Sequence, residues 1–518
     1  MNQVDNIVQI LEQRAKLHPE RPAIYSKKET ISYADFYANV RTTAHFIQKK
    51  GLKPGDRILV YVPMSIRLYE ILLAIFSNGM TAVFADAWTT KNRLSEITNF
   101  LEPKAFWGIP KAHIFRILHK SIRKIPHHWF PGSGKSSTTF SDEIIHPNAN
   151  EPALITLTSG STGFPKAANR THAFLLAQHA VLSETLQLEE ASFDMPTLPI
   201  FVLNNLATGV TTVLPDMDFI KAENVNPAKI IAQWKTYKVD SVTGSPVFFD
   251  KMADFVIESK LSDYLPQKIF LGGAPVYPYL TKKLRLAFPK TEIQIVYGST
   301  ESEPISEVSV DEFLEYGNQH QTKGLFTGKP VKQIETIILP ITSGEIESET
   351  DEELRKSVLK KGEIGEIVVK GPHVLPSYVN QPKEEKLNKI KTATSVWHRT
   401  GDAGFFDEEG RLFLTGRATS AIEWKGKLLF SFPIEMILSE LPEIKHAALL
   451  KKNSELKLVI SFKDTSTKKL SESTRKKVEE LVLNYLSEIP KVQIVQSFPL
   501  DPRHNSKIDY VALGKMIK

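Results

Sequence analysis

Segments with helical spacing alternate with short strand-like runs along this chain. Ile66–Phe76 carries apolar residues at helical spacing, whereas Arg57–Val62, Ala153–Leu157 and Ile293–Val296 are runs of β-branched and aromatic residues. The two patterns differ in period, so each segment indicates one kind of element. Their alternation is typical of an α/β fold, and it limits the fold class more strongly than any other feature of the sequence.

The length of the chain predicts more than one domain. A chain of 518 residues exceeds what one hydrophobic core usually supports. From about Gly416 the pattern changes to a compact unit of strands and lysine-rich helices. We therefore expect a large N-terminal domain over residues 1–416 and a smaller α+β domain over residues 417–518. Two polar segments, Pro126–Asn150 and Ser343–Lys361, are expected to be a long loop and a solvent-exposed insertion.

Composition narrows the classes of function. With 42% hydrophobic and 24% charged residues, the chain has enough apolar content to fold throughout. It has no cysteine, which excludes disulfides, thiolate metal sites and a thioester carried by the protein itself, so a thiol acceptor would come from outside. The net charge of +6 is spread over many side chains and indicates ordinary solvation. We expect no nucleic-acid partner.

The sequence also predicts a cytoplasmic location. Its N-terminus lacks the basic start and apolar core of a signal peptide. The longest apolar stretch, Tyr69–Phe84, is interrupted by Glu70, Asn78 and Gly79. Such a stretch indicates a buried helix followed by a strand rather than a transmembrane segment.

The strongest local signal is the string LTSGSTGFPK, from Leu157 to Lys166, directly after an apolar strand-like run. Hydroxyl groups and glycines share this loop, so side-chain OH groups and backbone amides can converge on phosphate oxygens while the lysine adds a positive charge. The alternative, a flexible serine- and glycine-rich surface loop, is disfavoured by the preceding strand and the Pro-Lys ending. The candidate phosphate ligands are Thr158, Ser159, Gly160, Ser161, Thr162, Gly163 and Lys166.

This loop is not a Walker A motif, because the spacing to a GK[ST] ending is missing. A second string, GSGKSS at Gly132–Ser137, has the right ending, but Trp129 stands where the first glycine belongs and no strand is expected before it. We interpret GSGKSS as a loop, and a P-loop kinase is therefore disfavoured. His127 and His128 are adjacent in sequence, so their side chains would point to opposite faces of a strand or diverge on a helix. We therefore do not expect them to share a metal ion.

Further short motifs follow the phosphate loop in order. They are GGAP (Gly272, Gly273, Ala274, Pro275), VYGSTE (Val296–Glu301), RTGD (Arg399–Asp402) and the pair Gly416-Arg417. In VYGSTE an apolar strand ends at Gly298, so the hydroxyl of Thr300 and the carboxylate of Glu301 are expected at the carboxyl edge of a sheet, where α/β proteins bind ligands. Taken alone, VYGSTE and RTGD could each be an ordinary polar turn.

Together these motifs resemble the ANL superfamily of adenylate-forming enzymes, the AMP-dependent synthetases and ligases that include acyl-CoA synthetases, nonribosomal peptide adenylation domains and firefly luciferase. The resemblance implies a large α/β adenylation domain, a mobile C-terminal lid domain, and ATP and Mg²⁺ as cofactors. It also implies a role for each matching residue. Thr300 would contact the α-phosphate, Glu301 would hold Mg²⁺, Tyr297 would stack on adenine next to Gly298, and Asp402 and Arg417 would reach the ribose.

A late motif in the small domain resembles the part of the superfamily that supplies a catalytic lysine. The string FPLDPRHNSKID, from Phe498 to Asp509, places Lys507 in that role, where its charge would offset the negative charge that builds up as a carboxylate attacks phosphorus. Two positions depart from the family pattern. Ser506 stands where glycine is usual, and Thr419 stands where the hinge residue is usually Asp or Lys.

Other features resemble one branch, the β-lactone synthetases of bacterial olefin biosynthesis. They are RHNSKI at Arg503–Ile508, YGSTESEPIS, KGKLLFSFPIE at Lys425–Glu435, and Val202 where common acyl-CoA synthetases have histidine after an aromatic residue. This branch implies a fatty acid substrate with a 3-hydroxyl, whose attack on the adenylate closes a β-lactone, and contact with enzymes of the same pathway. The alternative is a fatty acyl-CoA synthetase that uses coenzyme A. A non-catalytic nucleotide-binding protein is disfavoured, because Lys166, Thr300, Glu301, Asp402 and Lys507 are all present.

Overall fold

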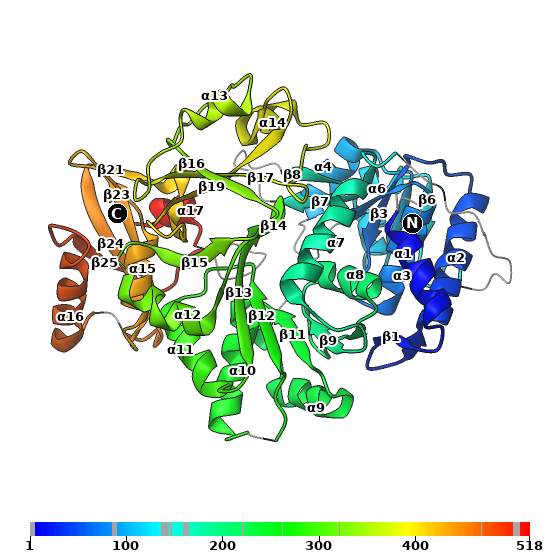
Figure 1. Cartoon of the computed structure of the whole chain (residues 1–518), viewed down its shortest axis with the longest axis horizontal. Helices are drawn as coiled ribbons and strands as arrows, with labels where there is room; N and C mark the ends of the chain where they lie inside the picture. The colour runs from blue at the N-terminus through cyan, green and yellow to red at the C-terminus, as the bar shows by residue number, and fades with distance from the viewer. Residues whose placement is uncertain are drawn as a thin grey trace.

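The chain is described by a computed structural model, which covers residues 6–84, 91–135, 145, 148–158, 165–219, 222–261, 263–320, 322–467, 469–500 and 508–517. Helices and strands alternate along most of it, so the predicted α/β fold class is confirmed. In Figure 1 the N-terminal part lies at one end of the long axis, the C-terminal part at the other, and the middle of the chain lies between them.

The N-terminal sheet has the strand order β6-β5-β3-β4-β7-β8 within the described residues, and β8 alone runs antiparallel to its neighbour. Its strands are β3 (Arg57–Tyr61), β4 (Thr81–Phe84), β5 (Ala105–Gly108), β6 (His127–Trp129), β7 (Pro152–Thr158) and β8 (Lys166–Thr171). The helices of this part are α1 (Ile7–Leu17), α2 (Tyr33–Lys49), α3 (Ile66–Ser77), α4 (Lys91–Leu101), α5 (His113–Leu118) and α6 (Lys120–Arg123).

Helix α3 explains the longest apolar stretch of the sequence. Every residue of α3 is buried, and the chain then turns into β4, so the predicted helix and strand are both confirmed. The two charged residues of the helix, Arg67 and Glu70, form a buried ion pair of 2.9 Å. A charge pair inside the core is tolerated because each partner satisfies the other.

The larger sheet joins a parallel half to an antiparallel half. Strands β1, β10, β9, β11, β12 and β13 are parallel, and β14, β15, β20, β19, β17 and β16 continue the sheet as antiparallel strands. The parallel half has the strands β1 (Pro22–Tyr25), β9 (Phe193–Pro196), β10 (Thr211–Val213), β11 (Ser241–Gly244), β12 (Lys268–Gly272) and β13 (Glu292–Ser299), with β2 (Thr30–Ser32) at its edge. The antiparallel half has β14 (Ser302–Ser309), β15 (Leu325–Pro330), β16 (Glu335–Leu339), β17 (Gly365–Lys370), β18 (Lys389–Lys391), β19 (Val396–Phe406) and β20 (Leu412–Arg417).

Helices from the middle of the chain cover this sheet (Figure 1). They are α7 (His172–Leu186), α8 (Pro199–Thr208), α9 (Pro227–Tyr237), α10 (Pro246–Glu258), α11 (Pro278–Ala287), α12 (Val310–Glu315), α13 (Asp351–Arg355) and α14 (Pro382–Asn388). Several are preceded by a serine, threonine or asparagine whose side chain accepts a hydrogen bond from a backbone amide of the first turn. This N-cap fixes where the helix begins. Within the described residues, no helix combines the length and the apolar character that crossing a bilayer requires.

After β20 the chain forms a unit with its own apolar core, drawn from Ile422 to Leu486. Its elements are β21 (Ile422–Trp424), β22 (Lys427–Leu429), α15 (Phe432–Ser439), β23 (Ile444–Lys452), β24 (Glu455–Phe462), α16 (Glu472–Leu483), β25 (Lys491–Ile494) and α17 (Tyr510–Met516). The Glu435 carboxylate in α15 accepts hydrogen bonds from Tyr277, 2.7 Å away beside α11, and from Tyr510. This carboxylate therefore ties the C-terminal unit to the large sheet.

Two sequence-based expectations were wrong in part. The predicted long loop at 126–150 begins with the strand β6, so a strand does precede GSGKSS. Periodicity missed β6 because it is short and lies at the edge of the sheet, where, in the described part of the chain, it pairs with β5 alone. The predicted insertion at 343–361 contains α13, in which Leu354 is buried and Asp351 accepts a hydrogen bond from Trp397 Nε1 at 3.0 Å. This segment is partly packed onto the sheet rather than fully solvent-exposed.

Candidate active site

The carboxyl ends of β12 and β13 bring two of the sequence motifs side by side. The strands are parallel and in register from Lys268 with Glu292 to Gly272 with Val296, so GGAP begins at the last residue of β12, next to the start of VYGSTE in β13. A Cβ on Gly272 would lie 2.6 Å from the carbonyl oxygen of Val296, so only glycine permits this close approach. Ala274 and Pro275 are half-buried beyond it, and Gly273 is exposed.

The phosphate-loop motif forms a hairpin whose two ends are adjacent. Thr158, at the end of β7, is paired with Lys166, at the start of β8. The predicted ligands Ser159, Gly160, Ser161, Thr162 and Gly163 lie outside the described residues, as does Lys507. The hairpin thus presents one hydroxyl and one ammonium group at the mouth of the loop.

Both groups meet the carboxylate of Glu301. The Lys166 ammonium lies 3.2 Å from Glu301 Oε1, the Thr158 hydroxyl donates to the same oxygen at 3.3 Å, and the Tyr378 hydroxyl donates to it at 3.1 Å. Within the described part of the chain no hydrogen bond or ion pair reaches Oε2. Glu301 itself is 6% exposed. One carboxylate oxygen is therefore held by three protein groups, whereas the other has no partner among the residues that the structure describes.

Electrostatics around Glu301 favour its ionised form. Burial alone would raise the pKa of Glu301, but the positive charges of Lys166 and Lys389 hold it well below its usual range. Burial lowers the pKa of Lys389 to about 7, although the nearby Glu301 opposes that shift. Burial also lowers the pKa of His398, which pairs with Lys389 across β18 and β19. The ionised form of Glu301 is thus favoured, beside two groups, Lys389 and His398, whose charged forms are disfavoured by burial.

The segment from Val374 to Gln381 links the two halves of this cluster, and the sequence did not predict it. At its start, the Leu375 amide donates to the Glu301 carbonyl at 2.7 Å. Further on, Tyr378 pairs with Ala168 of β8. The Gln381 side chain accepts from the Ala167 amide at 2.7 Å and donates to the Pro165 carbonyl at 3.0 Å. The segment therefore holds the phosphate-loop hairpin against the turn that carries Thr300 and Glu301.

Thr300 and its neighbours form the rest of that turn. Thr300 is half-buried, and its carbonyl oxygen accepts a hydrogen bond from Arg170 of β8 at 3.1 Å. The hydroxyl of Ser299 is buried and has no hydrogen-bond partner among the described residues. A buried hydroxyl without a partner is costly, and a ligand that accepts a hydrogen bond from it would satisfy it. The turn therefore offers hydroxyl donors at the carboxyl edge of the sheet.

A second cluster joins three further predicted residues. The Tyr297 hydroxyl donates to Asp402 Oδ2 at 2.8 Å, and an Arg417 guanidinium nitrogen donates to Asp402 Oδ1 at 2.6 Å. Asp402 and Arg417 face each other across β19 and β20. Gly401 has a φ of +69°, and a Cβ there would lie 2.6 Å from the Arg417 side chain. Glycine at this position lets the arginine reach the carboxylate.

The structure places the branch-specific position Val202 in the core. Val202 of α8 is fully buried in the N-terminal apolar cluster, whereas its neighbour Phe201 packs against Leu182, Leu186 and Phe270. Valine suits such a site because it leaves no polar group without a partner. The aromatic residue thus packs against Phe270 of β12.

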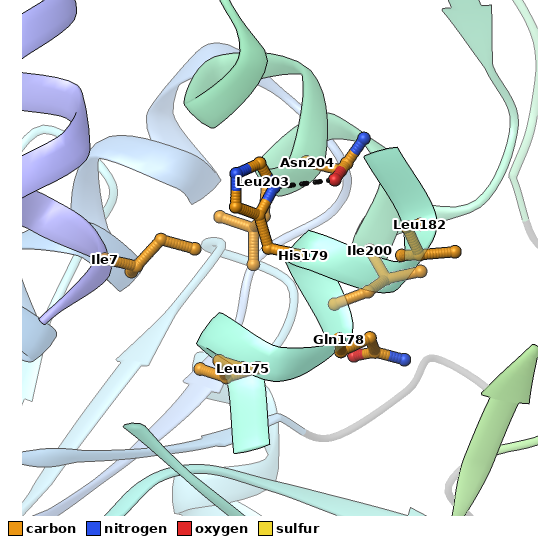
Figure 2. A pocket seen from close by; sticks show the side chains of 8 residues that line it. All are labelled: Ile7, Leu175, Gln178, His179, Leu182, Ile200, Leu203 and Asn204. Atoms are coloured by element: carbon orange, nitrogen blue, oxygen red, sulfur yellow. Dashed lines mark hydrogen bonds between the residues drawn. The ribbon is translucent and has the colours of Figure 1, made fainter. Parts of the chain in front are cut away.

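A small cavity lies between α1, α7 and α8 (Figure 2). Its volume is about 10 Å³, which holds about one water molecule and no acyl chain. His179 Nδ1 and Asn204 Oδ1 lie 2.8 Å apart in its polar wall. The lining residues are Ile7, Leu175, Gln178, His179, Leu182, Ile200, Leu203 and Asn204. The cavity is separate from the Glu301 cluster and gives no evidence of a substrate site.

The fold and the motif-bearing turns are those of adenylate-forming enzymes. Residues 11–379 match the family model for AMP-binding enzymes, so the chain belongs to the AMP-binding enzyme family, within the ANL superfamily. The predicted superfamily is thereby confirmed, and the chain is an AMP-forming ligase, a class that uses ATP.

Two curated relatives are olefin β-lactone synthetases. The protein of Stenotrophomonas maltophilia is 27% identical over 98% of this chain and 97% of its own length. The protein of Xanthomonas campestris pv. campestris is 29% identical over 81% of this chain and 78% of its own length. A 2-succinylbenzoate–CoA ligase of Bacillus cytotoxicus is 25% identical over 86% of this chain and 85% of its own length. The chain is thus similar to members of more than one branch of the family.

Solved structures support the same fold. The amide bond synthetase of Marinactinospora thermotolerans superposes with a TM-score of 0.81 at 18% identity, over 99% of this chain and 100% of that one. The O-succinylbenzoate coenzyme A synthetase of Bacillus subtilis in complex with AMP superposes with a TM-score of 0.79 at 20% identity, over 98% of both chains. At these identities the likeness establishes the fold alone.

Proposed function

We propose that this enzyme uses ATP and Mg²⁺ to adenylate a 3-hydroxy fatty acid and then converts the acyl-adenylate to a β-lactone. The observation that carries the adenylation step is the convergence of Thr158, Lys166 and Tyr378 on one oxygen of Glu301. The lactone step is supported by the similarity to olefin β-lactone synthetases over nearly the whole chain. Adenylation and lactone formation are tested separately below.

The Glu301 carboxylate is a suitable ligand for Mg²⁺. Mg²⁺ prefers oxygen ligands and is usually held by one or two carboxylates together with substrate phosphates. Oxygen Oε1 of Glu301 is occupied by protein donors, so Oε2 is the atom that would contact the ion. When bound, the ion would neutralise charge on the phosphate oxygens. Lys166 would then leave Glu301 and bind phosphate. This exchange is favourable because the Lys166 ammonium would face a phosphate anion, while the Glu301 carboxylate would face Mg²⁺.

The remaining residues would bind and orient the nucleotide. The phosphate loop from Thr158 to Lys166 would hold the phosphates, with Thr300 donating to the α-phosphate. Asp402 is an acceptor-only carboxylate, so it suits the two ribose hydroxyls, and Arg417 orients it. Tyr297 would lie against adenine beside Gly298. Gly272, Gly273, Ala274 and Pro275 would line the nucleotide at the neighbouring strand end.

The chemistry then needs two displacements. In the first, a carboxylate oxygen of the acid attacks the α-phosphorus, the bond to pyrophosphate breaks, and Lys507 offsets the developing charge. In the second, the 3-hydroxyl oxygen attacks the activated carbonyl carbon, the bond to AMP breaks, and the hydroxyl proton passes to solvent. A tethered hydroxyl has a high effective concentration, which helps to offset the strain of the four-membered ring. We propose that residues 417–518 move as a lid that brings Lys507 to the site.

The lactone step is tested by product analysis without coenzyme A. With ATP, Mg²⁺ and a 3-hydroxy fatty acid, we expect many turnovers, with AMP and a β-lactone as products. The matching acid without the hydroxyl should release about one equivalent of pyrophosphate per enzyme and little AMP, because its adenylate lacks an internal nucleophile and keeps AMP bound. If the hydroxy acid also stalls, and coenzyme A restores turnover with a thioester product, the lactone proposal is wrong.

The second candidate function is therefore fatty acyl-CoA synthesis. The similarity to a putative acyl–CoA ligase of Bacillus subtilis, 23% identical over 83% of this chain, favours it. Both functions share the adenylation step. Acid-dependent exchange of labelled pyrophosphate into ATP measures that step alone, and Lys507→Ala should abolish it while leaving the Tm nearly unchanged. Unchanged exchange in this variant would show that the late motif has been misassigned.

A further inference from the structure

A stretch of the N-terminal part carries positive charge without negative charge. Between Glu102 and Asp142 the sequence contains no aspartate or glutamate. Its lysines and arginines are Lys104, Lys111, Arg116, Lys120, Arg123, Lys124 and Lys135. Most of this stretch lies around α5, α6 and β6, at the edge of the N-terminal sheet and at the opposite end of the molecule from the C-terminal unit (Figure 1).

The same stretch exposes large apolar side chains. Ile114, Ile117 and Leu118 of α5 are 52%, 72% and 56% exposed. Their spacing of three and four residues places them on one face of the helix. Phe130 is 46% exposed, and its ring lies 4.0 Å from the ring of His113 at the start of α5. Ile114, Ile117 and Leu118 therefore form one apolar group, and Phe130 contacts the start of the same helix through His113.

Exposed cations flank this apolar group. Lys111 precedes α5, and Lys120, Arg123 and Lys124 follow it, all with exposed side chains. None of them forms an ion pair with a carboxylate within the described residues. The lysine-rich helix α16 differs, because its lysines stand among Glu472, Glu479 and Glu480. Among the residues that the structure describes, no carboxylate neutralises the positive charge around α5.

We propose that this surface docks the enzyme onto an anionic lipid bilayer. We define the α5–α6 surface by Lys111, Ile114, Ile117, Leu118, Lys120, Arg123, Lys124 and Phe130. Exposed aliphatic and aromatic side chains next to lysines and arginines match the boundary between lipid headgroups and acyl chains. A nucleic acid or a purely acidic protein surface would use the cations but would gain little from the exposed isoleucines and leucine. The inference goes beyond the proposed function, and it would place the enzyme where fatty substrates partition.

Co-sedimentation with vesicles tests the proposal on the full-length protein. The wild-type protein should bind phosphatidylcholine vesicles that contain phosphatidylserine, bind pure phosphatidylcholine vesicles weakly, and detach as salt is raised. The charge variant Lys120→Glu/Arg123→Glu/Lys124→Glu should lower the partition coefficient about tenfold or more, because each cation near an anionic surface contributes several-fold. The apolar variant Ile114→Ser/Ile117→Ser/Leu118→Ser should also lower it.

Matched controls separate the surface from general charge and exposure. Lys469→Glu/Lys476→Glu/Lys477→Glu changes the net charge by the same amount at exposed positions of the C-terminal unit. Leu17→Ser/Leu286→Ser/Val511→Ser removes side chains of 67%, 69% and 71% exposure elsewhere. Both controls should bind vesicles like the wild-type protein. All four variants should retain the wild-type Tm and pyrophosphate exchange, because none touches the Glu301 or Asp402 cluster.

Three outcomes would overturn the proposal. The wild-type protein could fail to co-sediment with anionic vesicles at low salt. The control triples could lose as much binding as the α5–α6 variants. The wild-type protein could bind polyglutamate but not vesicles, and the charge variant could lose the polyglutamate binding. That result would identify the surface as a site for acidic proteins. Vesicle binding is measured without substrate, so a failure of the proposed catalytic function would leave this test unaffected.

Discussion

The Glu301 and Asp402 clusters contain similar chemical groups but differ in how far they are buried. In both, a carboxylate accepts a hydrogen bond from a tyrosine hydroxyl and pairs with a cation. In the first, Glu301 is buried with Lys166 close by. In the second, Asp402 pairs with Arg417, whose side chain is 50% exposed. Burial strengthens charge interactions, so Glu301 is a buried carboxylate suited to a cation, whereas the more exposed Asp402 cluster is suited to neutral hydroxyl groups.

Removing the charge of Glu301 is the strongest test of the difference between the two clusters. We expect Glu301→Gln to lower pyrophosphate exchange about a hundredfold or more, because the amide keeps the shape but cannot neutralise a cation. The buried pair of Arg67 and Glu70 offers the matched control. Glu70→Gln should lower the Tm while leaving exchange in the folded protein intact. Equal exchange in Glu301→Gln and wild-type protein would contradict a role in metal binding.

Removing the charge of Asp402 should have a smaller and different effect. We expect Asp402→Asn to raise the KM for ATP about tenfold, because one strong acceptor for the ribose hydroxyls is lost, with kcat changing less. Steady-state kinetics at saturating acid would show the split. A loss in kcat with an unchanged KM would indicate that Asp402 acts on the transition state rather than on the bound nucleotide.

The two tyrosines give a matched pair of variants that sharpens the comparison. Tyr378→Phe removes one of the three groups that contact Glu301 Oε1, and Tyr297→Phe removes the hydroxyl that donates to Asp402 Oδ2. We expect Tyr378→Phe to raise the Mg²⁺ concentration at half-maximal activity several-fold, and Tyr297→Phe to raise the KM for ATP by a similar factor. Titrations of Mg²⁺ and ATP for both variants test this. Identical shifts in both titrations would show that the clusters do not have separate roles.

The smallest expected effect concerns stability and pH. The folded protein lowers the pKa of Lys389 from 10.5 to about 7, so the unfolded chain binds more protons between these values. Burying this lysine therefore destabilises the protein most at and below about pH 7, and stability from this group rises as the pH increases towards 10.5.

Replacement of Lys389 by methionine tests this pH dependence. Lys389→Met should gain stability relative to the wild-type protein at neutral pH, and the gain should shrink towards pH 10. Urea unfolding of both proteins across this range measures the difference. Lys283 pairs with Asp250 and Asp254 and is half-buried, so Lys283→Met is the control. A gain that is constant from pH 7 to pH 10 would show that Lys389 is not neutralised in the fold.

Local patterns predicted the elements that carry the motifs. The apolar run before the phosphate loop is β7, the run before VYGSTE is β13, and the stretch from Tyr69 to Phe84 is a helix followed by a strand. Each prediction depended on a long periodic segment or on a turn with distinctive residues. The errors concern two short elements, one of them a strand at the edge of a sheet. Strand β6 and helix α13 have too few residues for a period to be visible.

By itself, the sequence determined which chemical groups the enzyme can use, because loops rich in hydroxyls and glycine, strand-ending carboxylates and the order of motifs are properties of the chain. The tertiary structure alone decided which groups share Glu301. Thr158 and Glu301 are 143 positions apart, and Tyr378 is a further 77 positions away, so no local pattern could bring them together. The site also contains Tyr378, Gln381, Lys389 and His398. They lie there because the chain after β17 packs between the β7–β8 hairpin and the turn that joins β13 to β14. Its contacts depend on distances in space that sequence periodicity does not contain.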